Sequence, residues 1–133
     1  MADSVHTHLM FQNGRALEAL HHYEEIFDGA FTIDELDTYD EHAAGATAQV
    51  QLAICTLLGE RITCIDSPVE HGFDMTPAIS LFVECSDLDE LERLFDALAE
   101  GGVVFMPLDD YGFSRRYGWI ADRFGVPWQL NLR

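Results

Sequence analysis

The sequence contains no lysine, and acids far outnumber its basic residues. Seven arginines face 24 aspartates and glutamates, which gives the 133-residue chain a net charge of −17. Binding to nucleic acids or to anionic membrane surfaces requires a basic footprint, so this balance argues against both classes of partner. A high net charge favours solubility instead. We read no function from the absence of lysine.

The chain also lacks an apolar run near the ~20 residues that a membrane helix needs. Its first residues, Met-Ala-Asp-Ser-Val-His, contain neither the basic region nor the apolar region of a secretory signal. Apolar residues make up 48% of the sequence, which is enough to bury a core without disulfides or metals. We therefore expect a cytoplasmic protein with a single domain.

Cysteine is scarce and its spacing is uninformative for metal binding. Cys55, Cys64 and Cys85 are an odd number, and their separations match neither a zinc motif nor a disulfide framework. Each lies in an apolar stretch with no basic neighbour that would lower the pKa of its thiol. We expect all three to be small buried hydrophobic residues.

The sequence does contain an internal repeat. A strand-like segment at residues 5–11 precedes a helical stretch at 15–28. In the second half, a strand-like segment at residues 78–83 precedes another helical stretch, and the spacing of Asp87 and Glu90 is that of a capping pair at its start. The first helix is expected to bury Ala16, Ala19, Leu20, Tyr23, Ile26 and Phe27, and the second Leu88, Leu91, Leu94, Phe95 and Leu98. Gly29 lies eighteen positions after Phe11, and Gly101 lies eighteen positions after Val83, so the two halves match in spacing.

Three strand candidates follow each helix. They occupy residues 31–39, 47–58 and 60–66 in the first half, and 103–107, 117–122 and 126–132 in the second. Proline and glycine mark residues 67–77 as a linker. The pattern predicts an α+β fold of two βαβββ modules, about 5–66 and 78–133, with helices on one face of a mostly antiparallel sheet.

The C-terminal sequence Tyr117-Gly-Trp-Ile-Ala-Asp-Arg-Phe-Gly-Val-Pro-Trp-Gln-Leu130 resembles the closing signature of a known family. Residues 9–27 resemble the same family's first strand and helix, and residues 78–85 its fifth strand. This is the PhnB-like branch of the vicinal oxygen chelate (glyoxalase/bleomycin resistance/extradiol dioxygenase) superfamily, also described as demethylubiquinone methyltransferase-like. The resemblance implies paired βαβββ modules, a cleft and a homodimer.

In the enzymes of that superfamily, the resemblance further implies a divalent metal held by residues of the first, fourth, fifth and eighth strands. The matching positions here are His8 on the first strand and Gln129 on the eighth. Ala78 or Ser80 would stand on the fifth strand, and Glu60 or Cys64 on the fourth. A catalytic zinc site needs three protein ligands and an open position, so we expect no metal and no other cofactor. If a metal is bound, His8 and Gln129 are its candidate ligands.

The remaining histidines do not complete that set. His21 and His22 are expected on the solvated side of the first helix, and His42 and His71 in exposed loops. His6 shares a strand face with His8 by alternation, so a site built on this pair is left open as an alternative.

Strand alternation predicts which residues line a cleft for a small organic ligand. On the third strand, we expect Val50, Leu52 and Ile54 to face the helices and Gln49, Gln51 and Ala53 to face the cleft. The residues predicted to line the cleft are His8, Met10, Gln49, Gln51, Ser80, Phe82, Arg116, Trp119 and Gln129. These could equally be ordinary half-buried strand residues.

Residues 107–117 form a long connection of the kind that serves as a lid or binding loop. It carries the adjacent pair Arg115 and Arg116, for which pairing with nearby carboxylates is favoured over a role in binding anions.

Three functions are consistent with the sequence. The first is a glyoxalase-like protein that binds a small organic molecule without a complete metal site. The second is a metal-dependent lyase, isomerase or dioxygenase. The third is a resistance-type protein that sequesters a drug between the subunits of a dimer. A homodimer is expected in each case, because the first and fifth strands otherwise leave exposed sheet edges.

Overall fold

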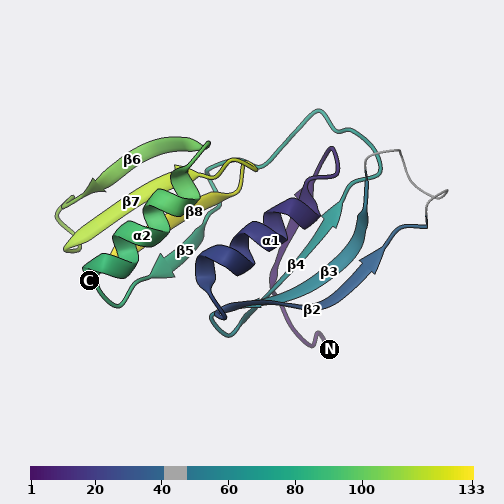
Figure 1. Cartoon of the computed structure of the whole chain (residues 1–133), viewed down its shortest axis with the longest axis horizontal. Coiled ribbons are helices and arrows are strands. Elements are labelled where there is room, and N and C mark those ends of the chain that lie inside the picture. Colours follow the sequence, from purple (N-terminus) through teal and green to yellow (C-terminus); the bar gives the residue numbers. More distant parts are fainter. Residues whose placement is uncertain (41–47) are drawn as a thin grey trace. The chain divides into compact units, whose positions relative to one another are not determined.

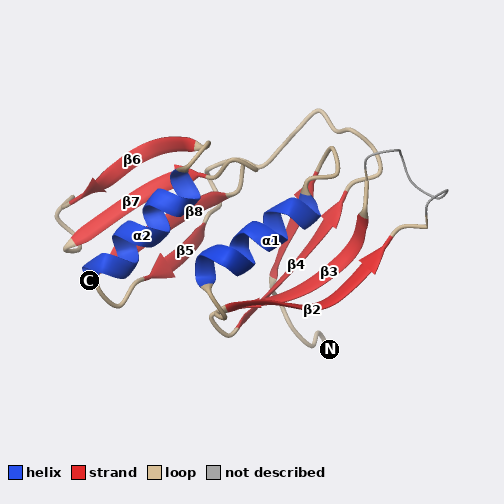
Figure 2. Cartoon of the chain, viewed as in Figure 1, coloured by secondary structure: helices blue, strands red, loops and turns tan. Residues whose placement is uncertain are grey.

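The computed structural model describes residues 1–40 and 48–133. Its chain divides into two compact units, Met1–Gly72 and Phe73–Arg133, with the boundary inside the predicted linker. Within the described residues, each unit contains one helix and four strands in the order strand, helix, strand, strand, strand (Figure 1; Figure 2). The predicted α+β fold of two βαβββ modules is confirmed. The expectations for His42 and for the strand start at Thr47 lie outside the described residues.

The first unit packs one helix against a mixed sheet. Its elements are β1 (Thr7–Phe11), α1 (Ala16–Phe27), β2 (Phe31–Thr38), β3 (Val50–Leu57) and β4 (Glu60–Asp66). The strands lie in the order β1-β4-β3-β2, with β1 and β4 parallel and the other neighbours antiparallel. All six apolar residues expected on the buried side of α1 are buried, from Ala16 to Phe27.

The second unit repeats this arrangement. Its elements are β5 (Leu81–Glu84), α2 (Leu88–Ala99), β6 (Val103–Asp109), β7 (Arg116–Ala121) and β8 (Pro127–Leu132). The strand order β5-β8-β7-β6 matches that of the first unit, again with a parallel first pair. Four of the five leucine and phenylalanine residues predicted on the buried side of α2 are buried. Leu88 is 43% exposed because it is the first residue of α2, where no preceding helical turn covers it.

One buried aspartate in each unit ties backbone segments together. The Asp66 carboxylate accepts N–H bonds from Ala16 (2.9 Å), Gln49 (3.1 Å) and Val50 (2.9 Å). Asp122 accepts bonds from the N–H groups of Phe124 and Val126, and from the indole of Trp128 at 2.9 Å. Because a buried carboxylate needs compensating hydrogen bonds, each aspartate fixes the segments that supply them.

The predicted bounds of the fifth and sixth strands differ from the structure. The strand expected from residue 78 begins at Leu81, and Ile79, which lies within the predicted strand, is 80% exposed. The sixth strand continues past Pro107 to Asp109, which leaves the connection to β7 as residues 110–115. Proline can stand in β6 because this strand lies at the edge of its sheet.

Candidate functional site

One face of the second sheet is turned away from α2. A Cβ added to Gly118 would lie 2.5 Å from the Phe95 ring of α2, so Gly118 faces the helix. Side chains alternate along a strand, which places Tyr117 and Trp119 on the opposite side. We call this side the aromatic face and define it by Phe82, Tyr117, Trp119 and Gln129.

The strand register gathers several of the predicted cleft residues on the aromatic face. Phe82 of β5 and Trp119 of β7 both stand directly opposite Gln129 of β8, and directly paired residues share a face of the sheet. Ser80 joins them, because the Gln129 amide donates a hydrogen bond to its hydroxyl at 3.2 Å. Four of the nine predicted cleft residues therefore lie together, although Ser80 precedes β5 and is not part of it.

Four aromatic rings form the largest feature of this face. The Tyr117 ring lies 4.9 Å from Phe113, 5.9 Å from Tyr111 and 6.5 Å from Phe82, measured between ring centroids. Tyr111 and Phe113 meet Tyr117 edge-on, the geometry that aromatic pairs prefer. We call these four residues the Tyr117 cluster. Tyr117 is buried, whereas Phe82 and Phe113 are 52% and 64% exposed, so the cluster presents apolar surface to the outside.

Both tyrosine hydroxyls of the cluster donate hydrogen bonds to residues beside it. The Tyr117 hydroxyl donates a short hydrogen bond to the Gln129 side-chain oxygen. Burial, with a smaller contribution from Tyr111, raises the pKa of the Tyr117 phenol, so this phenol stays protonated at neutral pH. The Tyr111 hydroxyl donates to the Pro107 carbonyl at 2.6 Å. These bonds fix the orientation of both tyrosine rings.

Arg116 lies on the other side of the sheet from the rest of this group. It stands opposite the buried Leu132, and its guanidinium is 3.9 Å from the Glu92 carboxylate on α2. The structure thus pairs Arg116 with an acid, as favoured by the sequence, and does not bring it to the aromatic face.

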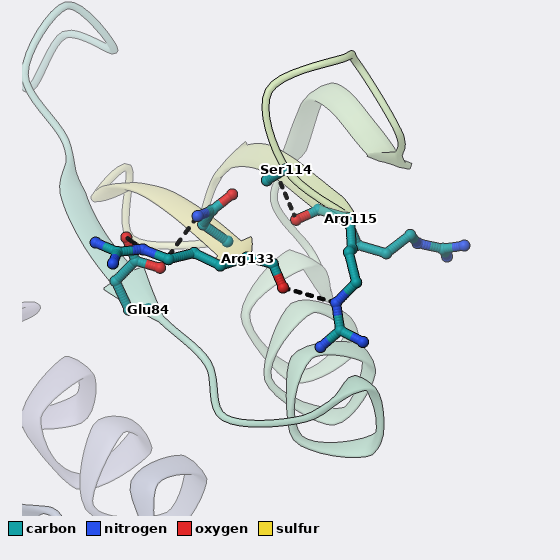
Figure 3. Close-up of polar contacts among 6 residues, drawn as sticks. Glu84, Ser114, Arg115 and Arg133 are labelled. Carbon is teal, nitrogen blue, oxygen red and sulfur yellow. Dashed lines mark hydrogen bonds and ion pairs between the residues drawn. The ribbon is translucent and has the colours of Figure 1, made fainter.

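Charged residues lie at the ends of β5 and β8, next to the row of the sheet that contains Asn131 and Tyr117. The Arg133 side chain extends to Glu84, with Nε 3.6 Å from the carboxylate, and the Asn131 amide donates to the same carboxylate at 3.0 Å (Figure 3). Arg115 donates from Nε to the carbonyl of Arg133 at 2.6 Å. The Ser114 hydroxyl donates to the Arg116 carbonyl at 3.2 Å, which closes the loop before β7.

The first sheet also has a face turned away from its helix. The Asp66 carboxylate accepts a hydrogen bond from the first backbone N–H of α1, so Asp66 faces the helix. Side chains alternate along β4, and Cys64 and Ile62 therefore face the helix as well. His8, Thr63 and Ile54 stand in register on the opposite side, together with Met10. We call this side the His8 face. The His8 Nδ1 atom lies 2.7 Å from the Thr63 hydroxyl.

The alternation predicted for the third strand is wrong at Ala53 and Ile54, whereas Val50 is buried. Ala53 is paired with Cys64 and fully buried on the α1 side, whereas Ile54 belongs to the His8 face. Gln51 is exposed at a β-bulge, where Leu52 and Val50 pair with successive residues of β2. Gln49 precedes β3 and its backbone N–H bonds Asp66. Neither glutamine stands in register with His8.

The donors on these two faces do not fit the divalent-metal centre that the resemblance implies. The fourth-strand residue opposite His8 is Thr63, a neutral hydroxyl, while Cys64 is buried on the α1 side. The acids of β2 lie three strands away from β1 across the sheet. In residues 1–40 and 48–133, no three His, Cys, Asp or Glu side chains are grouped to hold a metal ion. The absence of metal at His8 and Gln129 stays a prediction.

The cysteines are free and buried, as expected. Burial raises the pKa of the Cys64 thiol to about 12 and those of Cys55 and Cys85 to about 11. A thiol that stays protonated is a poor nucleophile, so these side chains belong to the core.

Sequence reasoning missed Tyr111, Phe113 and Tyr117, which form most of the cluster. The alternation of Tyr117 with Gly118 and Trp119 could have placed Tyr117 beside Trp119. Tyr111 and Phe113 lie in a loop, and no periodic pattern predicts where loop side chains point. The described helices include none long and apolar enough to cross a membrane.

A family model described as 3-demethylubiquinone-9 3-methyltransferase matches residues 3–131. The solved structure of a putative 3-demethylubiquinone-9 3-methyltransferase, PhnB protein, from Bacillus cereus is 42% identical, with a TM-score of 0.91, and the match covers 98% of this chain and all of that one. Protein YjdN of Escherichia coli (strain K12) is 32% identical over 53 residues, which are 40% of this chain and 36% of YjdN.

A glyoxylase/bleomycin resistance protein/dioxygenase domain from Frankia sp. EAN1pec shares the fold. It is 17% identical with a TM-score of 0.65, and the match covers 99% of this chain and 92% of that one.

Proposed function

Because this chain belongs to the family described as 3-demethylubiquinone-9 3-methyltransferase, in the glyoxalase-like superfamily, we propose that it binds a small organic molecule on its aromatic face. The observation that carries this proposal is the Tyr117 cluster. Its four rings meet in one place while two of them remain more than half exposed. Exposed aromatic surface beside a few fixed polar groups is typical of ligand sites.

The polar groups support binding more than chemistry. The Tyr117 phenol has a raised pKa, and the Gln129 amide is neutral at any physiological pH, so neither is a general base near pH 7. Their hydrogen bonds hold them in place, which lowers the entropy that a ligand must remove on binding. We therefore propose a binding role that needs no metal.

Calorimetric titration with para-tert-butylphenol, a neutral aromatic probe, tests this proposal. We expect saturable binding to the wild type, weakened roughly tenfold by Phe113→Ser and by Phe82→Ser, since each replaces apolar contact surface worth about 1–1.5 kcal/mol by a polar hydroxyl. Both residues are half exposed or more, so both variants should fold. Val69→Ser, which removes an exposed apolar side chain of the first unit, is the matched control and should bind as the wild type does.

Metal removal separates this function from the metal-dependent lyase, isomerase or dioxygenase alternative. Dialysis against EDTA should leave probe binding unchanged, and elemental analysis should find no stoichiometric transition metal. Stoichiometric metal together with loss of binding after dialysis would favour the enzymatic alternative instead.

We propose in addition that the protein forms a homodimer. β1 and β5 lie at the edges of their sheets, and unpaired edge strands are commonly covered in native proteins. Sedimentation equilibrium should give a mass near twice 15.0 kDa at micromolar concentration, and a mass near that of one chain would contradict the proposal.

A further inference from the structure

We infer that the ligand of the aromatic face is an organic cation, an ammonium group that carries apolar or aromatic substituents. This inference rests on the proposed function and names the chemical class that the Tyr117 cluster selects. It comes from two independent features of the second unit, the arrangement of the rings and the distribution of charge around them.

The first feature is the arrangement of the rings. Tyr111 and Phe113 meet Tyr117 at interplanar angles of 88° and 71°, whereas Phe82 is tilted by 34°. Tyr117 occupies the centre of this arrangement and is buried, whereas Phe82 and Phe113 on either side of it are more than half exposed. A cation can therefore lie against the exposed faces of these rings, the contact by which aromatic side chains bind quaternary ammonium groups.

The second feature is the charge beside the rings. Asp109 stands directly opposite Tyr117 in the β6–β7 register, and Asp110 directly precedes Tyr111. The side chains of Asp109 and Asp110 accept only nearby backbone N–H bonds, from Asp110 and Gly112. Two carboxylates without a cationic partner in the described residues thus border the cluster.

The nearby arginines do not reverse this charge. Arg116 is paired with Glu92 on the α2 side, and Arg133 is paired with Glu84 (Figure 3). Arg115 is directed to the carbonyl of Arg133. The chain carries a net charge of −17, so its long-range field attracts cations and repels anions.

Three probes of nearly the same shape test the inference. They are para-hydroxyphenyltrimethylammonium, the neutral para-tert-butylphenol and the anionic para-hydroxybenzenesulfonate, titrated at pH 6.5 and low ionic strength. We expect the cation to bind at least about fivefold more tightly than the neutral probe, and the sulfonate to bind more weakly than the neutral probe.

Two variants assign the preference to the rings and to the carboxylates. Phe113→Leu keeps an apolar side chain but removes a ring, so it should weaken binding of the cation severalfold while the neutral probe changes by less than twofold. The double variant Asp109→Asn with Asp110→Asn should reduce the difference in affinity between the cation and the sulfonate, while the affinity for the neutral probe stays the same. Phe113, Asp109 and Asp110 are all exposed, so the variants should fold, and circular dichroism and thermal unfolding check this.

The outcomes separate this inference from the proposed function. If the neutral probe binds and the cation binds no more tightly, the cation inference is wrong and the proposed function stands. If no probe binds, both are wrong. If the sulfonate binds best, or if Phe113→Leu weakens the cation and the neutral probe equally, the aromatic rings do not select a cation and the inference is overturned.

Discussion

The two units share one scaffold and differ on the face that the helix leaves uncovered. Both place the first strand parallel to the last and order the four strands identically. The His8 face of the first unit carries one imidazole–hydroxyl pair, with Ile54 and then Glu35 in the same row of the sheet. The aromatic face of the second unit carries four clustered rings. The fold is therefore determined by the covered faces, and the uncovered faces are free to differ in chemistry.

The units also begin their helices differently. The α2 helix is capped locally, because Asp87 accepts the N–H of Glu90 at 2.8 Å and Glu90 accepts the N–H of Ser86 at 3.0 Å. Arg15, the N-cap residue of α1, makes no side-chain cap bond, and the first amide of α1 is bonded by Asp66 from the end of β4. The first helix thus depends on a contact between distant parts of the chain, and the second on its own sequence.

The largest expected effect contrasts the two tryptophans of the second unit. Trp128 is 1% exposed and its indole bonds Asp122, so Trp128→Ala should lower the free energy of unfolding by about 3–5 kcal/mol. Trp119 lies on the aromatic face against Phe105, so Trp119→Ala should cost about 1 kcal/mol and mainly affect ligand binding. Urea denaturation of both variants measures the difference. A larger loss for Trp119→Ala would mean that the faces of the second sheet are assigned the wrong way round.

The next largest effect concerns the hydrogen bonds by which Asp66 joins distant segments of the first unit. Asp66→Asn replaces an acceptor of three backbone N–H bonds by a group that can accept at only one of its two positions. We expect a loss of about 2–4 kcal/mol, because buried N–H donors are left unsatisfied. Asp37→Asn, at an exposed carboxylate of β2, is the control. Equal stability of the two variants in urea would show that Asp66 does not hold the unit together.

The smallest effect tests the difference between the helix starts. Asp87→Ala removes a side-chain cap and should cost about 1 kcal/mol. Arg15→Ala, at the N-cap of α1, removes no such bond and should cost less. The same loss at both positions, measured by thermal unfolding, would argue against local capping as the distinction between the two helices.

The covered parts of the molecule could be predicted from sequence because their signals are local and periodic. The buried residues of α1, the Asp87–Glu90 cap and the repeated order of helices and strands along the chain all follow from spacing in the sequence. The faces of β3 could not be predicted in this way, because both sets of alternate residues are largely apolar. Leu52 and Ile54 compete with Ala53 and Cys55, and the small residues are the ones that pack under α1.

The candidate site was predicted mainly on and beside its strands, although Tyr117 of β7 was missed. Phe82, Trp119 and Gln129 follow from alternation, because the register of β5, β7 and β8 brings them into one row. Tyr111 and Phe113 are placed by the loop of residues 110–115, whose conformation depends on bonds such as that from Tyr111 to Pro107. Arg116 was assigned to the same face as Trp119, but its neighbour Tyr117 occupies that face instead.

An NMR titration with para-tert-butylphenol, followed at each backbone amide, tests most directly which unit binds the ligand. We predict that saturable shifts concentrate at Phe82, Tyr117 and Gln129 on the aromatic face, while His8, Thr63 and Ile54 remain unchanged. Shifts that concentrate on the His8 face, or that never saturate on either face, would contradict the assignment of ligand binding to the second unit.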